Sequence, residues 1–429
     1  MDSLYTLSPK AIWRQFKQES FAFWMICGYL FMQYVEPQTI YKSLAILPWD
    51  KIFIGLTTLG LLTDPQRRWV RDRSNIWMTL FLIVILLSSE FAIFPATSWS
   101  NWFKFFGWYA IYFLIINTVT TPERYFIFLI IFLLATFKMA FFGARTWAER
   151  GFSFQGWGIQ GPAGFFENSG EYSIQMLMFF PIAYELFGFL KSRISRAKQL
   201  FLMLFPITGV MTVLGASSRG SQVALAGQVG WIAYQHKLKI RTLIAMVLVL
   251  WAGYMLLPNK EIARFSRAGD DKTSVQRLEY WKAGMHMIGE HPVLGIGFFN
   301  FPLVFKIEHP NELFDGVAQL PHNIFIQVGT DAGILGLGIF LILIYRNLKA
   351  AKDIQRACQE NKDAPAFASS VARGLTTAAW GFVVAGQFVT VAYYPFFWIN
   401  LALTVSLANV VSRTIAPAAS GGKRRPIHS

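Results

Sequence analysis

Long apolar stretches recur along most of this sequence, and they limit what the chain can fold into. Many run for about 17 residues or more, the length that an α-helix needs to cross a lipid bilayer. Only 15% of the residues are charged, against about a quarter in soluble domains. A transmembrane β-barrel would instead show segments of about ten residues that alternate between apolar and polar. The sequence therefore predicts an all-α, polytopic membrane protein.

The apolar pattern predicts twelve transmembrane helices that short connections mostly join. We expect them over residues 20–36, 44–63, 75–94, 101–118, 124–142, 171–190, 198–216, 219–235, 242–257, 323–345, 370–391 and 395–412. A mostly polar segment of about 65 residues separates the ninth span from the tenth. The predicted domains are helices 1–9 in 1–257, a loop domain in 258–322, helices 10–12 in 323–412, and a basic tail in 413–429.

The distribution of Lys and Arg predicts the orientation of these spans. With both termini in the cytoplasm, the cytoplasmic segments hold 24 Lys and Arg, and the short outer connections hold 5. This asymmetry is typical of membrane proteins, so the net charge of +15 indicates topology rather than nucleic-acid binding. The polar, amphipathic start does not resemble a cleavable signal peptide. We expect residues 258–322 on the outer side.

The stretch VLGASSRGSQVALAGQVG, residues 213–230, places Arg219 in a tight turn between two apolar runs. An arginine at the bilayer centre costs about 2.5–3.5 kcal/mol, so Arg219 is expected at the outer interface. Small residues surround it, and they would allow a ligand or another backbone to approach closely. The alternative is an arginine that only extends its charge to the membrane surface.

A second arginine lies in the outer segment, in SVQRLEYWKAGMHMI. This pattern predicts an amphipathic helix with Leu278, Trp281, Met285 and Ile288 along one apolar stripe. Arg277 and Trp281 are four residues apart and therefore share a face. If the helix lies on the membrane surface, Arg277 is simply a solvated charge.

The stretch LPHNIFIQVGTDAG places His322 where the chain re-enters the membrane. Pro321 restricts the conformation of Leu320, and Asn323 is suited to cap the helix that follows. Of the six histidines, His322 alone is expected at the outer entrance of a span. Histidine is also the side chain best suited to general-base catalysis near neutral pH. The alternative is a structural histidine at a helix start.

The glycine-rich and aromatic connection GFSFQGWGIQGPAGFFENSGEYS, residues 151–173, is a weaker signal. It suits a loop that binds a sugar or an extended chain, but an interfacial aromatic belt explains it equally well. Arg145 and Arg150 precede it and would add positive charge to a substrate site there.

The sequence predicts no metal and no other cofactor. Asp270 and Asp271 have no third carboxylate or histidine close by. His286 and His291 are five residues apart, whereas a metal site on a helix favours four. The Gly-x-Gly of HPVLGIGFFNF follows no strand, which excludes a dinucleotide-binding unit. The glycines of GILGLGIF are expected to serve helix packing.

Two arginines and a histidine at one outer level suit group transfer from a lipid pyrophosphate. A pyrophosphate leaves without being protonated, and guanidinium groups bind it through paired hydrogen bonds. The same groups stabilise the charge that grows as the sugar bond breaks. The acceptor alcohol needs one general base, so a carboxylate pair of the glycosidase kind is not required.

Three of these segments resemble the bacterial O-antigen ligase and polymerase superfamily. The resemblance is strongest over residues 213–345 and is looser at GPAGFFENS, residues 161–169. Relatives often carry an Asn-Pro-Asn-like motif after Gly-Phe-Phe, but this chain has ENSGEYS, which leaves Asn168 and Glu171 without a role. The segments that carry the resemblance are SSRGSQVALAG, RLEYWKAGMHMIGEHPVLGIGFFNF and LPHNIFIQVGTDAGILGLGIFLIL.

The resemblance implies a GT-C-like, metal-independent and inverting glycosyltransferase of the bacterial inner membrane. It would transfer a glycan from undecaprenyl pyrophosphate to lipid A-core on the periplasmic face. Arg219 and Arg277 would bind the donor pyrophosphate, and His322 would activate the acceptor hydroxyl. Trp281, Asn323, Arg145 and Arg150 are further candidates for substrate binding.

Other functions fit parts of the pattern. An O-antigen polymerase or a protein O-oligosaccharyltransferase would use the same donor and chemistry. A transporter of the lipid-linked glycan would need charges along its path, but the first nine spans hold few Lys or Arg away from their ends, among them Lys104 and Lys138. No inverted repeat of broken helices supports transport either. A receptor or scaffold gives no reason for a base at a span entrance.

Overall fold

The computed structural model describes residues 1–64, 67, 69–154, 158–237, 272–313 and 316–415. These residues form helices and connections, without a β-sheet in the described ranges. The helices are α1 (Asp2–Tyr5), α2 (Pro9–Lys17), α3 (Phe21–Val35), α4 (Pro37–Ile40), η1 (Lys42–Ile46), α5 (Trp49–Thr63), α6 (Arg73–Glu90), α7 (Pro95–Asn101), α8 (Phe103–Thr118), α9 (Pro122–Glu149), α10 (Ser169–Leu190), α11 (Arg196–Gly215), α12 (Arg219–Gln235), α15 (Lys272–Glu290), α16 (Phe301–Glu308), η2 (Pro310–Glu312), α17 (Ile324–Glu360), α18 (Ala368–Ala385) and α19 (Pro395–Ile415).

Helices lie where the apolar pattern predicts spans. Eleven of the twelve expected spans coincide with a described helix, and the ninth, 242–257, lies outside the described residues. Within the described residues, six helices are long and apolar enough to cross a bilayer, namely α6, α9, α10, α11, α17 and α19. The all-helical, polytopic architecture is therefore confirmed.

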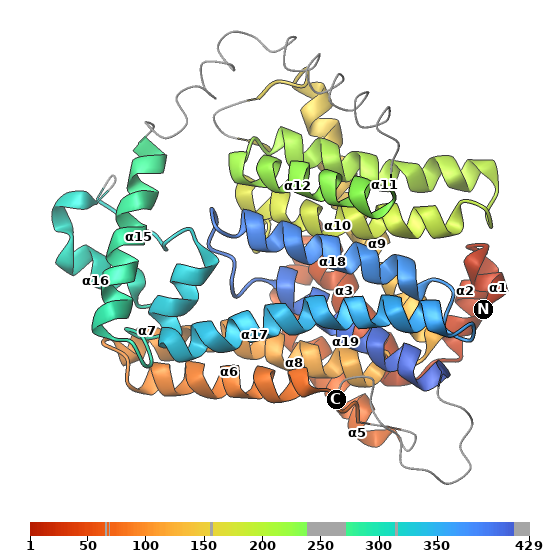
Figure 1. The fold of residues 1–429 in the computed structure, drawn as a ribbon, viewed down its shortest axis with the longest axis horizontal. Helices are drawn as coiled ribbons and strands as arrows, with labels where there is room; N and C mark the ends of the chain where they lie inside the picture. Colours follow the sequence, from red (N-terminus) through yellow and green to blue (C-terminus); the bar gives the residue numbers. More distant parts are fainter. Residues whose placement is uncertain (65–66, 68, 155–157, 238–271, 314–315, 416–429) are drawn as a thin grey trace.

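Most of the long helices, such as α6, α17 and α18, run along the long axis of the molecule and separate two ends (Figure 1). α7, α15 and α16 lie at one end, and α1 and α2 lie at the other. The predicted topology likewise places the segment after residue 258 and the N-terminus on opposite sides. Residues 258–271 of the predicted loop domain and 416–429 of the predicted tail lie outside the described residues.

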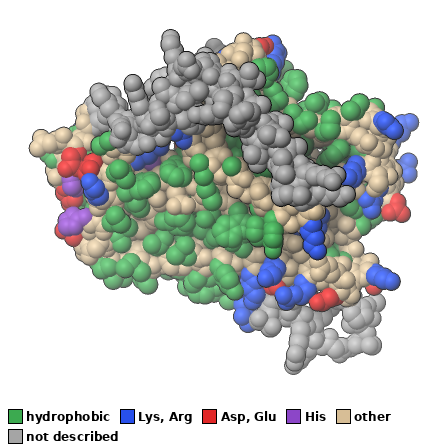
Figure 2. Space-filling model, turned by 45° about the horizontal axis from the view of Figure 1, so that its top comes forward, with side chains coloured by type: hydrophobic (Ala, Val, Ile, Leu, Met, Phe, Trp, Pro, Cys, Tyr) green, Lys and Arg blue, Asp and Glu red, His purple; other side chains and the backbone are tan. Residues whose placement is uncertain are grey.

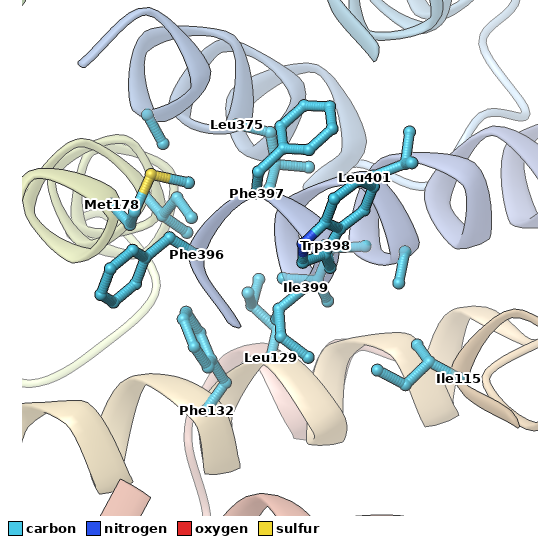
Figure 3. Close-up of a cluster of buried hydrophobic side chains, with 14 of the residues drawn as sticks. Ile115, Leu129, Phe132, Met178, Leu375, Phe396, Phe397, Trp398, Ile399 and Leu401 are labelled. Carbon is cyan, nitrogen blue, oxygen red and sulfur yellow. The ribbon is translucent and has the colours of Figure 1, made fainter. Parts of the chain in front are cut away.

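α19 forms the centre of the bundle. In its most apolar window, 89% of the residues are buried inside the protein. Trp398 and Phe397 are almost fully buried, and the neighbouring side chains of α19 face Leu129 and Phe132 of α9 (Figure 3). α10 and α18 pack against α19 from the other sides and fix its place in the bundle. The connection that precedes α19, residues 386–394, is thereby held at a fixed position.

α6 shows the opposite pattern and exposes an apolar face. Ile76, Leu80, Ile83 and Leu87 are each more than one third exposed, and their spacing places them on one side of the helix. Apolar side chains gather across the middle of the visible face, and most of the visible Lys and Arg lie toward the end opposite the histidines (Figure 2). Such a belt suits contact with lipid.

α17 is kinked at Gly333, where φ is +64°. A side chain there would place its Cβ 2.3 Å from the carbonyl oxygen of Val293. At the kink, the N–H of Ile296 donates to the carbonyl of Thr330 at 2.8 Å. The expectation of simple helix packing is therefore wrong for Gly333, because this glycine allows the outer segment to bond to the backbone of α17.

Two helices extend beyond the predicted spans. α17 continues to Glu360, so the basic stretch after residue 345, which contains Cys358, is helical. Arg346 anchors this extension, because its Nη2 lies 3.3 Å from Oδ1 of Asp72 at the start of α6. α9 continues to Glu149 and carries Arg145 on its last turns.

Candidate active site

His322 lies immediately before α17 in an unusual backbone conformation. Its φ of +51° falls in the left-handed region, which residues other than glycine rarely adopt. Its N–H donates to Oγ1 of Thr390 at 2.8 Å, which holds this conformation. Asn323 caps α17 as predicted, since its Oδ1 accepts from the N–H groups of Phe325 at 2.9 Å and Ile326 at 3.2 Å.

The imidazole of His322 is held in its neutral form. Burial and the nearby positive charge of Arg277 lower the pKa of His322 from 6.5 to about 4. The ring nitrogen Nε2 lies 3.0 Å from Oε1 of Gln319, which fixes its orientation. The structure thus brings Arg277 within electrostatic reach of His322, and the neutral ring keeps a lone pair available to accept a proton.

Trp281 joins α15 to the histidine segment. Its Nε1 donates to the carbonyl oxygen of Pro321 at 3.0 Å, directly before His322. Its ring centroid lies 6.4 Å from that of Phe388 in the connection between α18 and α19. Arg277 and Trp281, which share a helix face in the sequence prediction, therefore both approach the segment that carries His322.

The predicted apolar stripe of α15 is only partly buried, since Trp281 and Ile288 are half-buried. Leu278 and Met285 are 49% and 61% exposed, whereas Tyr280 is fully buried. The Tyr280 ring packs edge-on against Phe305, with centroids 4.6 Å apart, and against Phe301. α16 covers Tyr280, and α17 packs along the neighbouring side of α15, so these two helices together determine which side is buried.

Arg219 begins α12, as the tight turn predicts. Ser218 is the N-cap residue, and within the described residues its side chain makes no capping hydrogen bond. A Cβ at Gly220 would lie 2.5 Å from the ring of Phe388. The start of α12 therefore contacts the same ring that Trp281 approaches, which links the surroundings of Arg219 to those of Arg277 and His322.

Residues 386–394, GQFVTVAYY, link α12, α15 and the segment that carries His322. The sequence does not predict this role. Besides Phe388 and Thr390, the carbonyl of Gly386 accepts from the N–H of Ile324 at 2.9 Å. Because the stretch is apolar, most of it was assigned to the span 370–391, although α18 ends at Ala385. The polar Gln387 and Thr390 before Pro395 were the available signal.

The connection 151–173 packs on the turn before Arg219. The N–H of Ile159 donates to the carbonyl of Gly215 at 3.1 Å. A Cβ at Gly158 would lie only 1.7 Å from the carbonyl oxygen of Ala216, so only glycine fits there. This backbone approach explains one glycine of that connection.

The structure gives contacts to Asn168 and Glu171. Nδ2 of Asn168 donates to Oε2 of Glu171 at 3.1 Å. The Tyr394 hydroxyl donates to the same carboxylate, and burial together with the charge of Glu171 raises the pKa of Tyr394. The Tyr394 ring lies 5.1 Å from that of Phe165. This group fastens the loop to the 386–394 connection.

The remaining candidates lie on the surface. Nε of Arg145 donates to Oε1 of Glu149 at 2.7 Å, and the Arg145 side chain is 68% exposed. Arg150 ends α9 and is also exposed. Substrate binding by these two arginines stays a prediction.

No group of three or more His, Cys, Asp or Glu that could hold a metal occurs within the described residues. Asp270 and Asp271 lie outside the described residues.

Comparisons with known proteins concern the same region. Residues 178–341 match the family model described as O-Antigen ligase, and this range includes Arg219, Arg277 and His322 but not the 386–394 connection. Proteins provisionally named polysaccharide ligases from Rickettsia prowazekii and Rickettsia typhi are 31% identical over 88 residues, which is 19% of this chain. The chain covers 22% of the length of each relative. Over residues 178–341, the chain is therefore similar to the O-antigen ligase family.

Proposed function

We propose that this protein is a GT-C-like glycosyltransferase of the bacterial inner membrane. It transfers a glycan from undecaprenyl pyrophosphate to lipid A-core on the periplasmic face. The observation that carries this proposal is the position of half-buried His322, whose N–H Thr390 holds and whose pKa the nearby Arg277 lowers. The match of residues 178–341 to the family model described as O-Antigen ligase supports the same function.

The donor pyrophosphate is bound by Arg277 and Arg219. The start of α12 adds the backbone N–H donors of Gly220 and Ser221, which follow Arg219 in the chain, and a helix N-terminus favours an anion. As the bond between the anomeric carbon and the phosphate oxygen breaks, the electron pair moves onto the pyrophosphate. The arginines stabilise this charge through paired hydrogen bonds.

The acceptor hydroxyl is activated by His322. The neutral imidazole takes the hydroxyl proton while the oxygen attacks the anomeric carbon, and inversion follows from attack on the face opposite the leaving pyrophosphate. The pyrophosphate anion offsets the charge of Arg277 and so raises the pKa of His322 toward the range where a base is effective.

We also propose that the ninth expected helix completes twelve spans, with both termini in the cytoplasm. The domains follow the predicted boundaries, with residues 258–322 on the periplasmic side. This arrangement is supported by the separation of α15 and α16 from α1 and α2 along the bundle (Figure 1). It places the proposed site where a lipid-linked donor of the outer leaflet can reach it.

The test is transfer by the purified protein in lipid nanodiscs that contain EDTA and no added metal. A glycan-capped lipid A-core band that is lost in His322→Ala and kept in Asn311→Ala is expected; Asn311 is exposed in η2. If the lipid-linked glycan becomes longer while lipid A-core stays unused, the protein is a polymerase and not a ligase. Transfer to a protein acceptor alone would indicate an O-oligosaccharyltransferase. Activity that requires added Mg²⁺ would contradict metal-independent transfer.

A further inference from the structure

A small recess lies beside the far end of the 386–394 connection. Its volume is about 180 Å³, and four helices and one loop contribute to it. Its walls touch the connection, because Nε1 of Trp108 donates to the carbonyl of Tyr393 at 2.8 Å and Phe165 packs against Tyr394. Thr390 of the same connection holds His322. The residues that line the recess include Gln33, Asp50, Asn101, Lys104, Trp108 and Phe165.

The recess also contacts the glycine motif of the outer segment. Nζ of Lys104 lies 4.3 Å from the ring centroid of Phe299, a cation–π distance. The N–H of Phe299 donates to Oδ1 of Asp331 in α17 at 2.9 Å. The recess is therefore joined to the elements of the proposed site at two points, through Tyr393 and Tyr394 and through Phe299.

The lining combines aromatic walls with groups that donate and accept hydrogen bonds. Trp108 and Phe165 contribute apolar surface, with their rings 5.3 Å apart. Gln33 and Asn101 offer amides, and Asp50 offers a carboxylate. A sugar ring needs this combination, because its C–H face is apolar and its hydroxyls require donors and acceptors at the edge.

Other ligands fit the recess less well. A lipid chain would cover Asp50 and Lys104 without satisfying them, which is costly. A phosphate would meet the Lys104 ammonium but also the carboxylate of Asp50, whose negative charge disfavours a second anion in the same recess. The volume is also smaller than the roughly 300–1,000 Å³ of pockets that hold drug-sized ligands. It suits a single ring.

We propose that this recess binds one sugar residue of a substrate glycan and so selects which glycan is presented to His322. The inference rests on the proposed function for the origin of that glycan. The sugar belongs either to the acceptor core or to the donor, and both offer the same chemistry to the recess.

The experiment measures saccharide binding and transfer separately. The probes are the delipidated core oligosaccharide and the free glycan released from the donor, each titrated against the protein in nanodiscs by microscale thermophoresis. Gln33→Ala and Asp50→Asn are compared with Asn311→Ala, which lies outside the recess. Unfolding temperatures verify that the variants fold.

One probe is expected to lose at least fivefold in affinity in both recess variants and to be unaffected by Asn311→Ala. The KM for the substrate that carries this sugar rises by the same factor, and kcat stays within twofold. Loss for the core oligosaccharide identifies an acceptor subsite, and loss for the free glycan identifies a donor subsite.

Unchanged affinity for both saccharides in folded recess variants would overturn the inference. His322→Ala separates this outcome from failure of the proposed function, because it should bind the saccharide normally without transferring it. If no transfer occurs in any assay but saccharide binding still depends on Gln33 and Asp50, the result supports the sugar subsite and contradicts the proposed ligase activity.

Discussion

Left-handed backbone at Ser217, Phe299 and His322 marks the three segments that meet at the candidate site. Their φ values are +55°, +60° and +51°. This conformation costs roughly 1–2 kcal/mol for a residue with a side chain, so the surrounding structure must hold it. At His322 the holding contact is the hydrogen bond to Thr390. Thr390 is therefore expected to position the proposed base, His322, without touching substrate.

Thr390→Val keeps the shape of the side chain but removes the oxygen that accepts the N–H of His322. An unsatisfied buried N–H costs about 1–3 kcal/mol, so we expect kcat to fall by about tenfold to a hundredfold. Thr390→Ser keeps the acceptor and is the matched control. Equal activity of the two variants in the transfer assay would show that this hydrogen bond does not position His322.

The low pKa of His322 predicts an unusual reactivity profile. Diethyl pyrocarbonate modifies the neutral imidazole of histidine. Mass spectrometry of the digested protein then measures how much of His322 alone has been modified at each pH. His322 is expected to stay reactive below pH 6.5 and to lose reactivity only near pH 4. Arg277→Gln should move this limit upward, because a nearby positive charge disfavours the imidazolium. A midpoint near pH 6.5 in the unmodified protein would contradict the arrangement.

The same shift has a defined sign for stability. Because the folded pKa of about 4 lies below the ordinary 6.5, the fold binds this proton more weakly than the unfolded chain does. The stabilisation is fully present above pH 6.5 and is lost as the pH falls toward 4.

At the scale of elements, α17 depends on its kink. Gly333→Ala would force a side chain into a left-handed position and against the carbonyl of Val293. The strain alone costs about 1–2 kcal/mol, so the unfolding temperature and the activity should both fall. Gly338→Ala in the same helix meets open space and serves as the control. Similar unfolding temperatures for both variants would mean that the kink is not required.

The sequence predicts helix positions better than helix environments. Long apolar stretches identify α10 or α19 directly, because a bilayer imposes their length and composition. The rotation of α15 was not predictable, since α16 buries Tyr280 and leaves Met285 exposed.

The site shows a similar division. The residue types and motifs predict Arg219, Arg277 and His322 as site residues from the sequence alone, and their roles stay a prediction. The sequence does not reveal Phe388 and Thr390, because their roles come from contacts with α12, α15 and the start of α17. An apolar connection looks like a helix until such partners are known.

At the scale of the whole molecule, the site lies at the end of the bundle that carries α15, away from α1 and α2 (Figure 1). The apolar face of α6 and the buried α19 explain how this elongated bundle sits in a bilayer with its polar ends outside. If the proposed site at the α15 end acts on one side of the membrane, every molecule must have that end on the same side.

Single cysteines test this topology in a background with Cys27→Ala and Cys358→Ala. Met285→Cys on α15 should react with an impermeant maleimide in spheroplasts, because Met285 is exposed at the proposed outer end. Lys352→Cys on the exposed extension of α17 should react only after the membrane is permeabilised. The reverse labelling pattern would exclude a periplasmic site.

The most direct test of the central claim separates donor binding from turnover in two variants. The account predicts that His322→Ala binds the undecaprenyl-pyrophosphate-linked glycan within about threefold of the unmodified protein but loses turnover by about 10²–10⁴-fold. Arg277→Gln should lose donor binding itself, because the pyrophosphate loses a paired cation. Equal loss of donor affinity in both variants, or transfer that survives in His322→Ala, would contradict a site in which arginine holds the donor and His322 is the base.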